Sequence, residues 1–121
     1  MTQRVTQVVT MPNGMPLRVL DHRARGTDFA TWEAEAIRAI SAELISLGMG
    51  SREAVVYDIG AEEGEFSALW GHMVGPGNVH LFEPTPSVWP NIRATWEANH
   101  GAKRPGGMWQ GFVGAGMRGP G

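Results

Sequence analysis

The sequence predicts an α/β fold in which parallel strands alternate with helices behind an N-terminal β-hairpin and a further helix. Two short runs rich in β-branched and aromatic residues, 54–60 and 78–82, are each followed by a segment with the apolar spacing of a helix. The connections are short, as in βαβ units on one parallel sheet. With 121 residues and 42% hydrophobic content, the chain has room for one packed domain.

The N-terminal segment predicts a hairpin and then a polar connection. Two β-rich runs within residues 4–20 flank Asn13-Gly14, a dipeptide that tolerates the positive φ of a tight hairpin turn. A proline on either side of this turn removes a ladder donor, so we expect the hairpin at an edge or on the surface. Residues 21–30 are polar, and we therefore assign 1–30 to a hairpin and its connection.

A helix is predicted next, from about Thr31 to Leu47. Its apolar residues recur at spacings of three and four and form one stripe, made of Ile37, Ile40, Leu44 and Leu47. Gly48 stands where a residue with left-handed backbone would end the helix.

The following segment carries the two strands and two more helices. Residues 54–60 are typical of a strand that is buried on both faces. The helix after it, 65–74, has its apolar residues at i, i+3, i+4 and i+7, and the strand 78–82 follows. A second helix is expected from Ser87 to about Asn99, with Ser87 as its cap.

The C-terminal part predicts one more strand and a tail. MWQGFV at 108–113 is suited to extend the sheet as a third strand. Residues 114–121 are rich in glycine, with nothing to bury, and predict a flexible tail.

Composition excludes several classes of protein. A net charge of −2 argues against a nucleic-acid binder, which normally carries a basic excess. No apolar run approaches the roughly 18–20 residues that span a bilayer, so no membrane association is expected. The absence of cysteine rules out disulfides and thiolate metal sites and fits a cytoplasmic chain, and we expect no metal site.

The candidate site lies at the carboxyl ends of the two strands, where open α/β sheets bind ligands. Asp58, Gly60 and Gly64 follow the first strand, and Glu83 follows the second. The glycines permit a sharp turn that brings a ligand close to bare backbone, and the next helix points its free N–H groups at the same place. Glu83 is placed to accept hydrogen bonds from both hydroxyls of a ribose.

The charges of the first loop discriminate between two adenosine-containing ligands. A dinucleotide site requires G-x-G-x-x-G, whereas this loop reads G-A-E-E-G and lacks the third glycine. Glu62, Glu63 and Glu65 would repel a pyrophosphate but suit a ligand with a cationic amine and a sulfonium. The loop therefore favours S-adenosyl-L-methionine over NAD.

Two segments resemble a known family. VVYDIGAEEGEFS resembles the first motif of class I S-adenosylmethionine-dependent methyltransferases, and HLFEPTPSVWPNIRATWEANH resembles their second. DIGAxxGEFS followed by FEPTP is most similar to the FkbM family, whose members are associated with O-methylation of sugar or natural-product hydroxyls. The resemblance covers about residues 54–100, with weaker similarity at 108–113. It implies a Rossmann-like cofactor-binding domain over 31–113.

The resemblance also implies roles for individual residues. Asp58 would hold the methionine amino end, Glu83 the ribose hydroxyls, and Pro84 would shape the wall beside the adenine. The backbone turn under the methionine moiety would be formed by Gly60, Ala61 and Gly64. Glu62 replaces the small or amide residue expected at its position, which leaves its role in cofactor binding open.

The resemblance implies that the domain is incomplete. The family's sheet has strand order 3-2-1-4-5-7-6, and the residues after Asp58 suffice for the 3-2-1 half. The strands that carry the acceptor pocket and any general base are missing, so the catalytic residues are unknown and little or no turnover is expected from the isolated chain. Its first strand would be an exposed apolar edge, which implies either a second chain that completes the sheet or a truncated product.

Simpler interpretations stand beside these. The glycines can serve only the backbone of a βα turn, Glu83 can be a solvent-facing helix cap, and the acids at 62, 63 and 65 can be helix-dipole partners and solvated charge. Accordingly, two alternatives to a methyltransferase remain. One is a non-catalytic fragment or interaction module that pairs through its sheet edge, and the other is a nucleotide- or NAD-binding Rossmann piece.

Overall fold

The computed structural model describes residues 5–26, 31, 33–48 and 53–114. In chain order the elements are β1 (Val5–Thr10), β2 (Pro16–Leu20), α1 (Asp21–Gly26), α2 (Ala34–Ser46), β3 (Val56–Ile59), α3 (Glu65–Val74), the 3₁₀ turn η2 (Pro76–Asn78), β4 (Val79–Phe82), the 3₁₀ turn η3 (Pro86–Val88), α4 (Trp89–His100) and β5 (Gly107–Trp109). Apart from Gly114, the predicted tail 114–121 lies outside the described residues.

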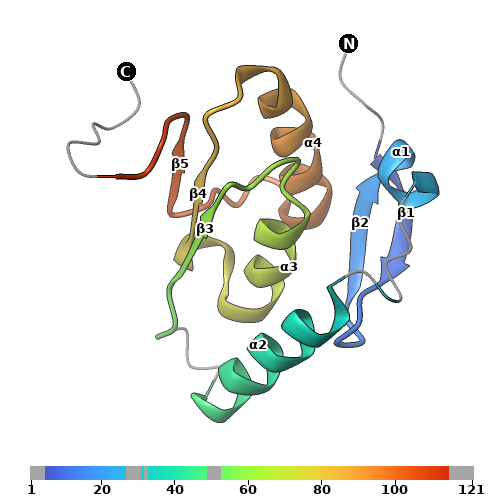
Figure 1. The fold of residues 1–121 in the computed structure, drawn as a ribbon, viewed down its shortest axis with the longest axis vertical. Coiled ribbons are helices and arrows are strands. Elements are labelled where there is room, and N and C mark those ends of the chain that lie inside the picture. The colour runs from blue at the N-terminus through green and yellow to red at the C-terminus, as the bar shows by residue number, and fades with distance from the viewer. Residues whose placement is uncertain (1–4, 27–30, 32, 49–52, 115–121) are drawn as a thin grey trace.

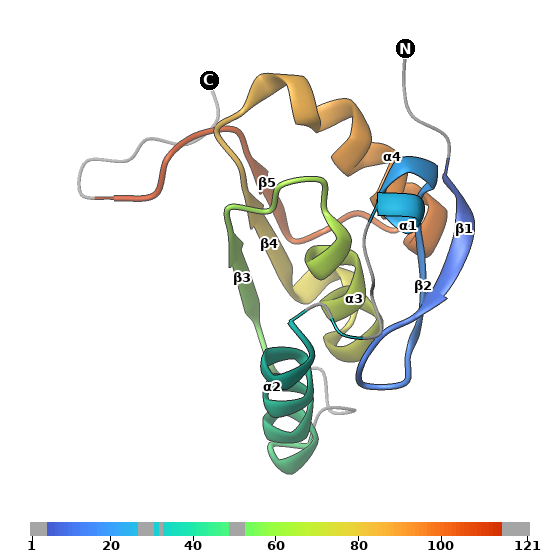
Figure 2. The ribbon, with the colours of Figure 1, turned by 45° about the vertical axis from the view of Figure 1, so that its right-hand side comes forward.

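Three layers make up the molecule. A sheet of β3, β4 and β5 forms one layer, α3 and α4 the middle one, and the hairpin of β1 and β2 the third (Figure 1, Figure 2). The strands of the sheet are parallel, in the order β3-β4-β5, so the predicted alternation of strands and helices on a parallel sheet is confirmed. No helix of the described residues has the length and apolar character needed to cross a membrane.

The core lies between the layers. Both helices turn their predicted apolar residues inward, and the most deeply buried of these are Leu69, Trp70, Met73, Trp89, Ile92 and Trp96. They pack in one cluster with residues from β4 and β2, namely Val79, Leu81, Leu17 and Val19. The hairpin is therefore an outer layer with one buried face.

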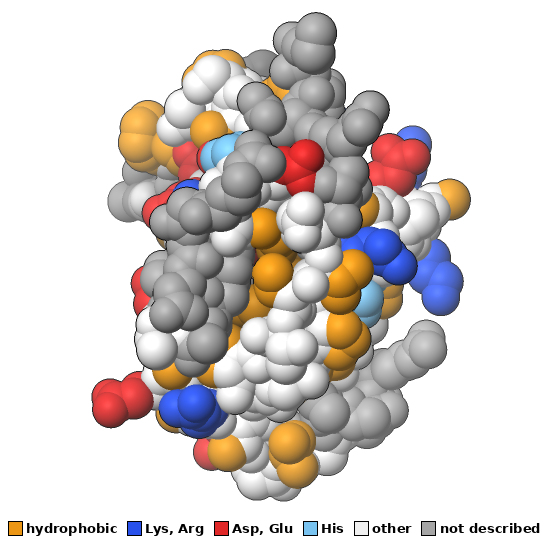
Figure 3. Space-filling view, turned by 90° about the vertical axis from the view of Figure 1, so that its right-hand side faces the viewer, with side chains coloured by type: hydrophobic (Ala, Val, Ile, Leu, Met, Phe, Trp, Pro, Cys, Tyr) orange, Lys and Arg blue, Asp and Glu red, His pale blue; other side chains and the backbone are white. Residues whose placement is uncertain are grey.

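The hairpin turn and its outer face agree with a surface position. Gly14 has φ +89° and donates its N–H to the carbonyl of Met11 at 2.7 Å. Val8 of β1 is largely exposed, and on this side of the molecule hydrophobic side chains are interspersed with polar ones (Figure 3).

Three local predictions are wrong. The polar connection 21–30 begins with a short helix, α1, which is held by side-chain contacts described below. Ser87 does not cap α4, because the chain enters that helix through η3 and the N-cap position, Val88, makes no side-chain hydrogen bond. The third strand ends at Trp109 rather than at 113, since its partner strand β4 ends at Phe82, the residue paired with Trp109.

The strand 54–60 is buried on one face only, contrary to the prediction. Both helices of the middle layer lie on the same side of the sheet (Figure 2). On the other side Tyr57 and Ile59 are 64% and 62% exposed, and β3 forms an edge of the sheet. The stripe of α2 is likewise only partly covered, because Ile37 is buried while Ile40 and Leu47 are exposed.

Candidate functional site

The loops that follow β3 and β4 meet at the carboxyl edge of the sheet. The N–H groups of Gly60 and Ala61 both donate to the carbonyl of Phe82, at 2.8 and 3.1 Å. The N–H of Glu83 donates to the carbonyl of Trp109 at 3.0 Å. Strand pairing thus continues past the strands, and the structure places Asp58 and Glu83 at one edge.

The first loop has an unusual backbone. Gly60, Glu62 and Gly64 have φ of +75°, +54° and +88°, a region that glycine enters freely and that costs glutamate about 1–3 kcal/mol. A Cβ on Gly64 would lie 3.4 Å from Cα of Ile92, an ordinary contact, so the positive φ and not a lack of space favours glycine there. A Cβ on Gly60 would meet nothing within 4 Å, which shows that bare backbone faces open space there.

The carboxylate of Glu83 joins the two loops. Its Oε1 accepts a hydrogen bond from the N–H of Glu62, and its Oε2 accepts one from the N–H of Thr85, both at 2.9 Å. Its carbonyl oxygen accepts from the indole N–H of Trp89 at 3.0 Å. Glu83 is only 6% exposed, so the carboxylate acts as a clamp between the loop after β3 and the loop after β4.

These bonds decide the ionisation of Glu83. Burial acts to raise its pKa, but the hydrogen bonds from Thr85 and from the backbone of Glu62 outweigh burial, and the net pKa lies below the ordinary value of 4.5. The residue is not a solvent-facing cap. A ribose would have to use the second lone pair of each oxygen, so the predicted ribose role stays a prediction.

Asp58 lies at the end of β3, where its Oδ2 accepts a hydrogen bond from the hydroxyl of Ser67 in the first turn of α3. Burial raises the pKa of Asp58, the bond from Ser67 opposes the rise, and the charges of Glu62 and Glu83 add to it. A cation brought to this carboxylate would relieve the unfavourable burial of its charge.

Helix α1 covers the loop from the hairpin side. The guanidinium of Arg23 pairs with the carboxylate of Glu65 and lies 4.0 Å from that of Glu62. Nε2 of His22 lies 3.1 Å from Glu63, which also accepts from the side-chain amide of Asn91. Glu63 and Glu65 therefore fasten α1 to the loop.

Their exposure separates the three acids. The side chain of Glu62 is 72% exposed, as expected of solvated charge, whereas that of Glu65 is 2% exposed. Burial raises the pKa of Glu65, and Arg23 opposes that rise. The interpretation as solvated charge is thus wrong for Glu65, which forms a buried ion pair with Arg23 at the start of α3.

A hollow of about 460 Å³ opens beside the first loop. It is lined by Arg23, Glu33, Asp58, Ile59, Gly60, Ala61, Glu62, Glu65 and Phe66. Four carboxylates thus stand against one guanidinium. Of the predicted site residues, Asp58, Gly60, Ala61 and Glu62 line this hollow, whereas Gly64, Glu83 and Pro84 do not.

Sequence reasoning missed Arg23, Glu33 and Ser67. Ser67 carried a signal, because it is a small polar residue on the buried side of a helix that starts beside Asp58. Arg23 and Glu33 reach the hollow from the N-terminal segment through tertiary packing, and no local pattern marks them.

Comparison of the chain with family models, with curated proteins and with solved structures finds no match. Within the described part of the chain, no three His, Asp or Glu side chains are grouped so as to hold a metal ion. The geometry and charge of the site are therefore the basis for assigning a function to this chain.

Replacing the clamp tests its contribution to stability. We expect Glu83→Gln to lower the free energy of unfolding at pH 7 by about 1.5–3 kcal/mol, because one acceptor becomes an NH₂ donor facing a backbone N–H. The folded-state pKa is lowered, so the carboxylate stabilises the fold above pH 4.5 and less as the pH falls through the folded-state pKa. Urea unfolding at several pH values should show the gap between the parent and the variant closing in acid. The matched control is Glu43→Gln, at an exposed position of α2. A stability difference between the parent and Glu83→Gln that is independent of pH, or no larger than that of the control, would contradict the role of Glu83 as a clamp.

Removal of Arg23 tests the ion pair. Arg23→Met leaves the buried carboxylate of Glu65 without its cation and should cost about 3–5 kcal/mol in urea unfolding. The double variant Arg23→Met/Glu65→Leu removes both charges and should regain most of that loss. Arg38→Gln, on the exposed side of α2, serves as the control. A single variant as stable as this control would show that the pair does not hold α1 in place.

Proposed function

We propose that the acidic hollow binds S-adenosyl-L-methionine and that the chain is the cofactor-binding part of a methyltransferase similar to the FkbM family. One observation carries the proposal: four carboxylates and one guanidinium surround bare backbone at the carboxyl end of a parallel strand. Such a lining attracts the amine and the sulfonium of this cofactor and repels a pyrophosphate.

The proposed roles of Asp58, Gly60 and Ala61 follow the lining of the hollow, whereas those of Glu83 and Pro84, which do not line it, follow the resemblance to the family. Asp58 receives the methionine amine, and the turn at Gly60 and Ala61 lets the methionine backbone approach. Glu83 holds the turn at Glu62 in shape and offers its remaining lone pairs to the ribose, with Pro84 beside the adenine. Under this proposal β5, β4 and β3 correspond, in that order, to strands 3, 2 and 1 of a Rossmann-like methyltransferase sheet.

Completion of the catalytic site needs more than the cofactor. S-adenosylmethionine supplies an electrophilic methyl group when bound, and alignment of the acceptor with that methyl is worth about 7–11 kcal/mol. The proposed acceptor is a hydroxyl of a small molecule or glycan. A second chain that pairs with the open edge of β3 would extend the sheet and supply the acceptor pocket. The same chain would cover the exposed side chains of Tyr57 and Ile59.

The same open edge supports a second candidate function. An interaction module that pairs through β3 would use the exposed apolar residues and the unpaired edge directly, without a cofactor. The other alternative, an NAD-binding piece, is disfavoured because a pyrophosphate would meet the carboxylates of Asp58, Glu62 and Glu65.

Calorimetric titration tests the proposal. We expect the parent chain to bind S-adenosylmethionine and not NAD, and Asp58→Asn to weaken binding about 10- to 100-fold. That variant keeps an oxygen for Ser67 while losing the charge that faces the amine. Glu43→Gln on α2 should bind like the parent.

Each other outcome contradicts the proposal. Binding of NAD alone would favour the dinucleotide alternative. Failure of the folded parent to bind either ligand, together with concentration-dependent self-association in sedimentation, would favour the interaction module. Equal affinity of Asp58→Asn and the parent for S-adenosylmethionine would show that Asp58 does not bind the cofactor.

A further inference from the structure

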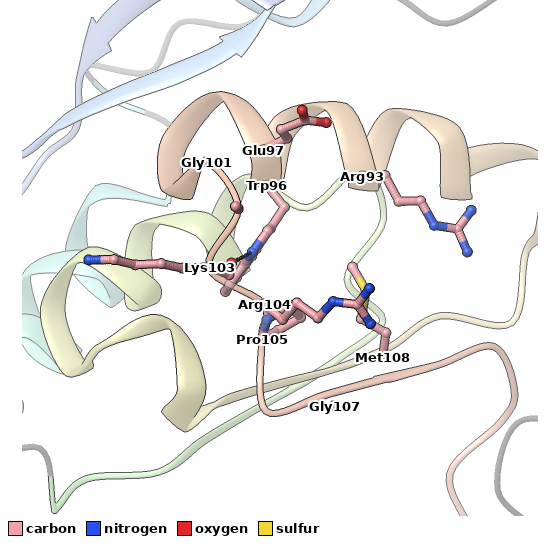
Figure 4. A pocket seen from close by; sticks show the side chains of 10 residues that line it. Arg93, Trp96, Glu97, Gly101, Lys103, Arg104, Pro105, Gly107 and Met108 are labelled. Carbon is pink, nitrogen blue, oxygen red and sulfur yellow. Dashed lines mark hydrogen bonds between the residues drawn. The ribbon is translucent and has the colours of Figure 1, made fainter.

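A second hollow, of about 720 Å³, lies beside α4. It is bounded by α4 and by the chain that leads from this helix into β5, residues 101–108 (Figure 4). Its lining shares no residue with the acidic hollow. Its volume falls within the range of about 300–1,000 Å³ typical of small-molecule sites.

The charge of this hollow is opposite to that of the rest of the chain. Three basic residues, Arg93, Lys103 and Arg104, line it with one acid, Glu97, although the chain as a whole carries −2. Among the described residues, no carboxylate lies within 4.0 Å of any of the three basic groups. The lining of the hollow therefore carries a net positive charge.

The side chains are arranged unevenly around the hollow. Figure 4 shows the guanidinium groups of Arg93 and Arg104 toward the same end of it, while Lys103 extends the other way and the carboxylate of Glu97 points away from them. The guanidinium of Arg93 lies 5.5 Å from the ring centroid of Trp89, a cation–π contact that positions it. Each of these planar guanidinium groups can donate a pair of hydrogen bonds to an anion bound at this end of the hollow.

The floor of the hollow is apolar and fixed. Trp96 is buried, and its indole N–H donates to the carbonyl of Lys103 at 2.8 Å, so the ring ties the 101–108 segment to α4. Trp96 is only 5% exposed, and because its N–H is already satisfied, the small accessible part of the ring is apolar. Pro105 and the half-buried Met108 extend this surface.

From this arrangement we infer that the second hollow binds a small organic phosphate. The phosphate lies between Arg93 and Arg104, and the planar or apolar body of the ligand lies against Trp96 and Met108. Two guanidinium groups at one end suit a single phosphate group of a dissolved metabolite. An extended nucleic acid would require a longer basic track than the lining of this hollow presents. The site is independent of the proposed cofactor site.

Phenyl phosphate is the probe for this site. Its binding is followed in ¹H–¹⁵N spectra of the whole chain. We expect saturable shifts of the indole N–H of Trp96 and of the backbone amides of residues 101–104 and 106–108. Inorganic phosphate should bind at least about tenfold more weakly, because it lacks the apolar body, a difference of about 1.4 kcal/mol. The double variant Arg93→Gln/Arg104→Gln should lose at least about tenfold in affinity, whereas Arg38→Gln on α2 should bind like the parent.

Three results would overturn the inference. The first is unchanged binding by the double variant with well-dispersed spectra, which show that it is folded. The second is equal affinity for inorganic and phenyl phosphate, which would remove the apolar floor from the site. The third is tighter binding of a short single-stranded oligonucleotide than of phenyl phosphate, which would make the hollow part of a nucleic-acid surface.

Discussion

The carboxylate of Glu83, held between two backbone N–H groups, is the contact on which the candidate site depends. It joins the loop after β3 to the loop after β4 and stabilises Glu62 in a backbone conformation that glutamate rarely adopts. Hydrogen bonds to a charged acceptor are stronger away from water, and Glu83 is nearly inaccessible. Its position turns two separate βα turns into one rigid edge, beside which the acidic hollow opens.

The layers of the molecule divide its charge. Acidic groups gather at the carboxyl edge of the sheet, where Arg23 reaches them from α1 and neutralises only part of their charge. The hairpin packs on α3 and α4 and so brings α1 over the first loop. At the second hollow, beside α4, the balance reverses, with Arg93 and Arg104 at one end of an apolar floor. The proposed cationic and anionic ligands thus occupy two hollows that share no lining residue.

The sequence predicted those features that local pattern determines. The apolar spacing of 65–74 identified α3 and its buried residues, and β-branched runs located β3 and β4. Features set by tertiary packing could not be predicted from the sequence. Helix α1 is too short to be stable alone and depends on the partners of Arg23. A continuous apolar run does not reveal whether one face or both are covered, so the pattern predicted burial on both faces of β3, and only the resemblance indicated an exposed first strand. Glu83 was identified, but its bonds to the loops depend on backbone geometry that sequence does not show.

A ¹H–¹⁵N pH titration of the amides that donate to Glu83 tests the central contact most directly. An amide bonded to a carboxylate shifts as that carboxylate is protonated. If Glu83 joins the loops, the amide protons of Glu62 and Thr85 should titrate together, with one midpoint below 4.5. Amides that do not shift, or that shift with separate midpoints or with a midpoint at or above 4.5, would contradict the account.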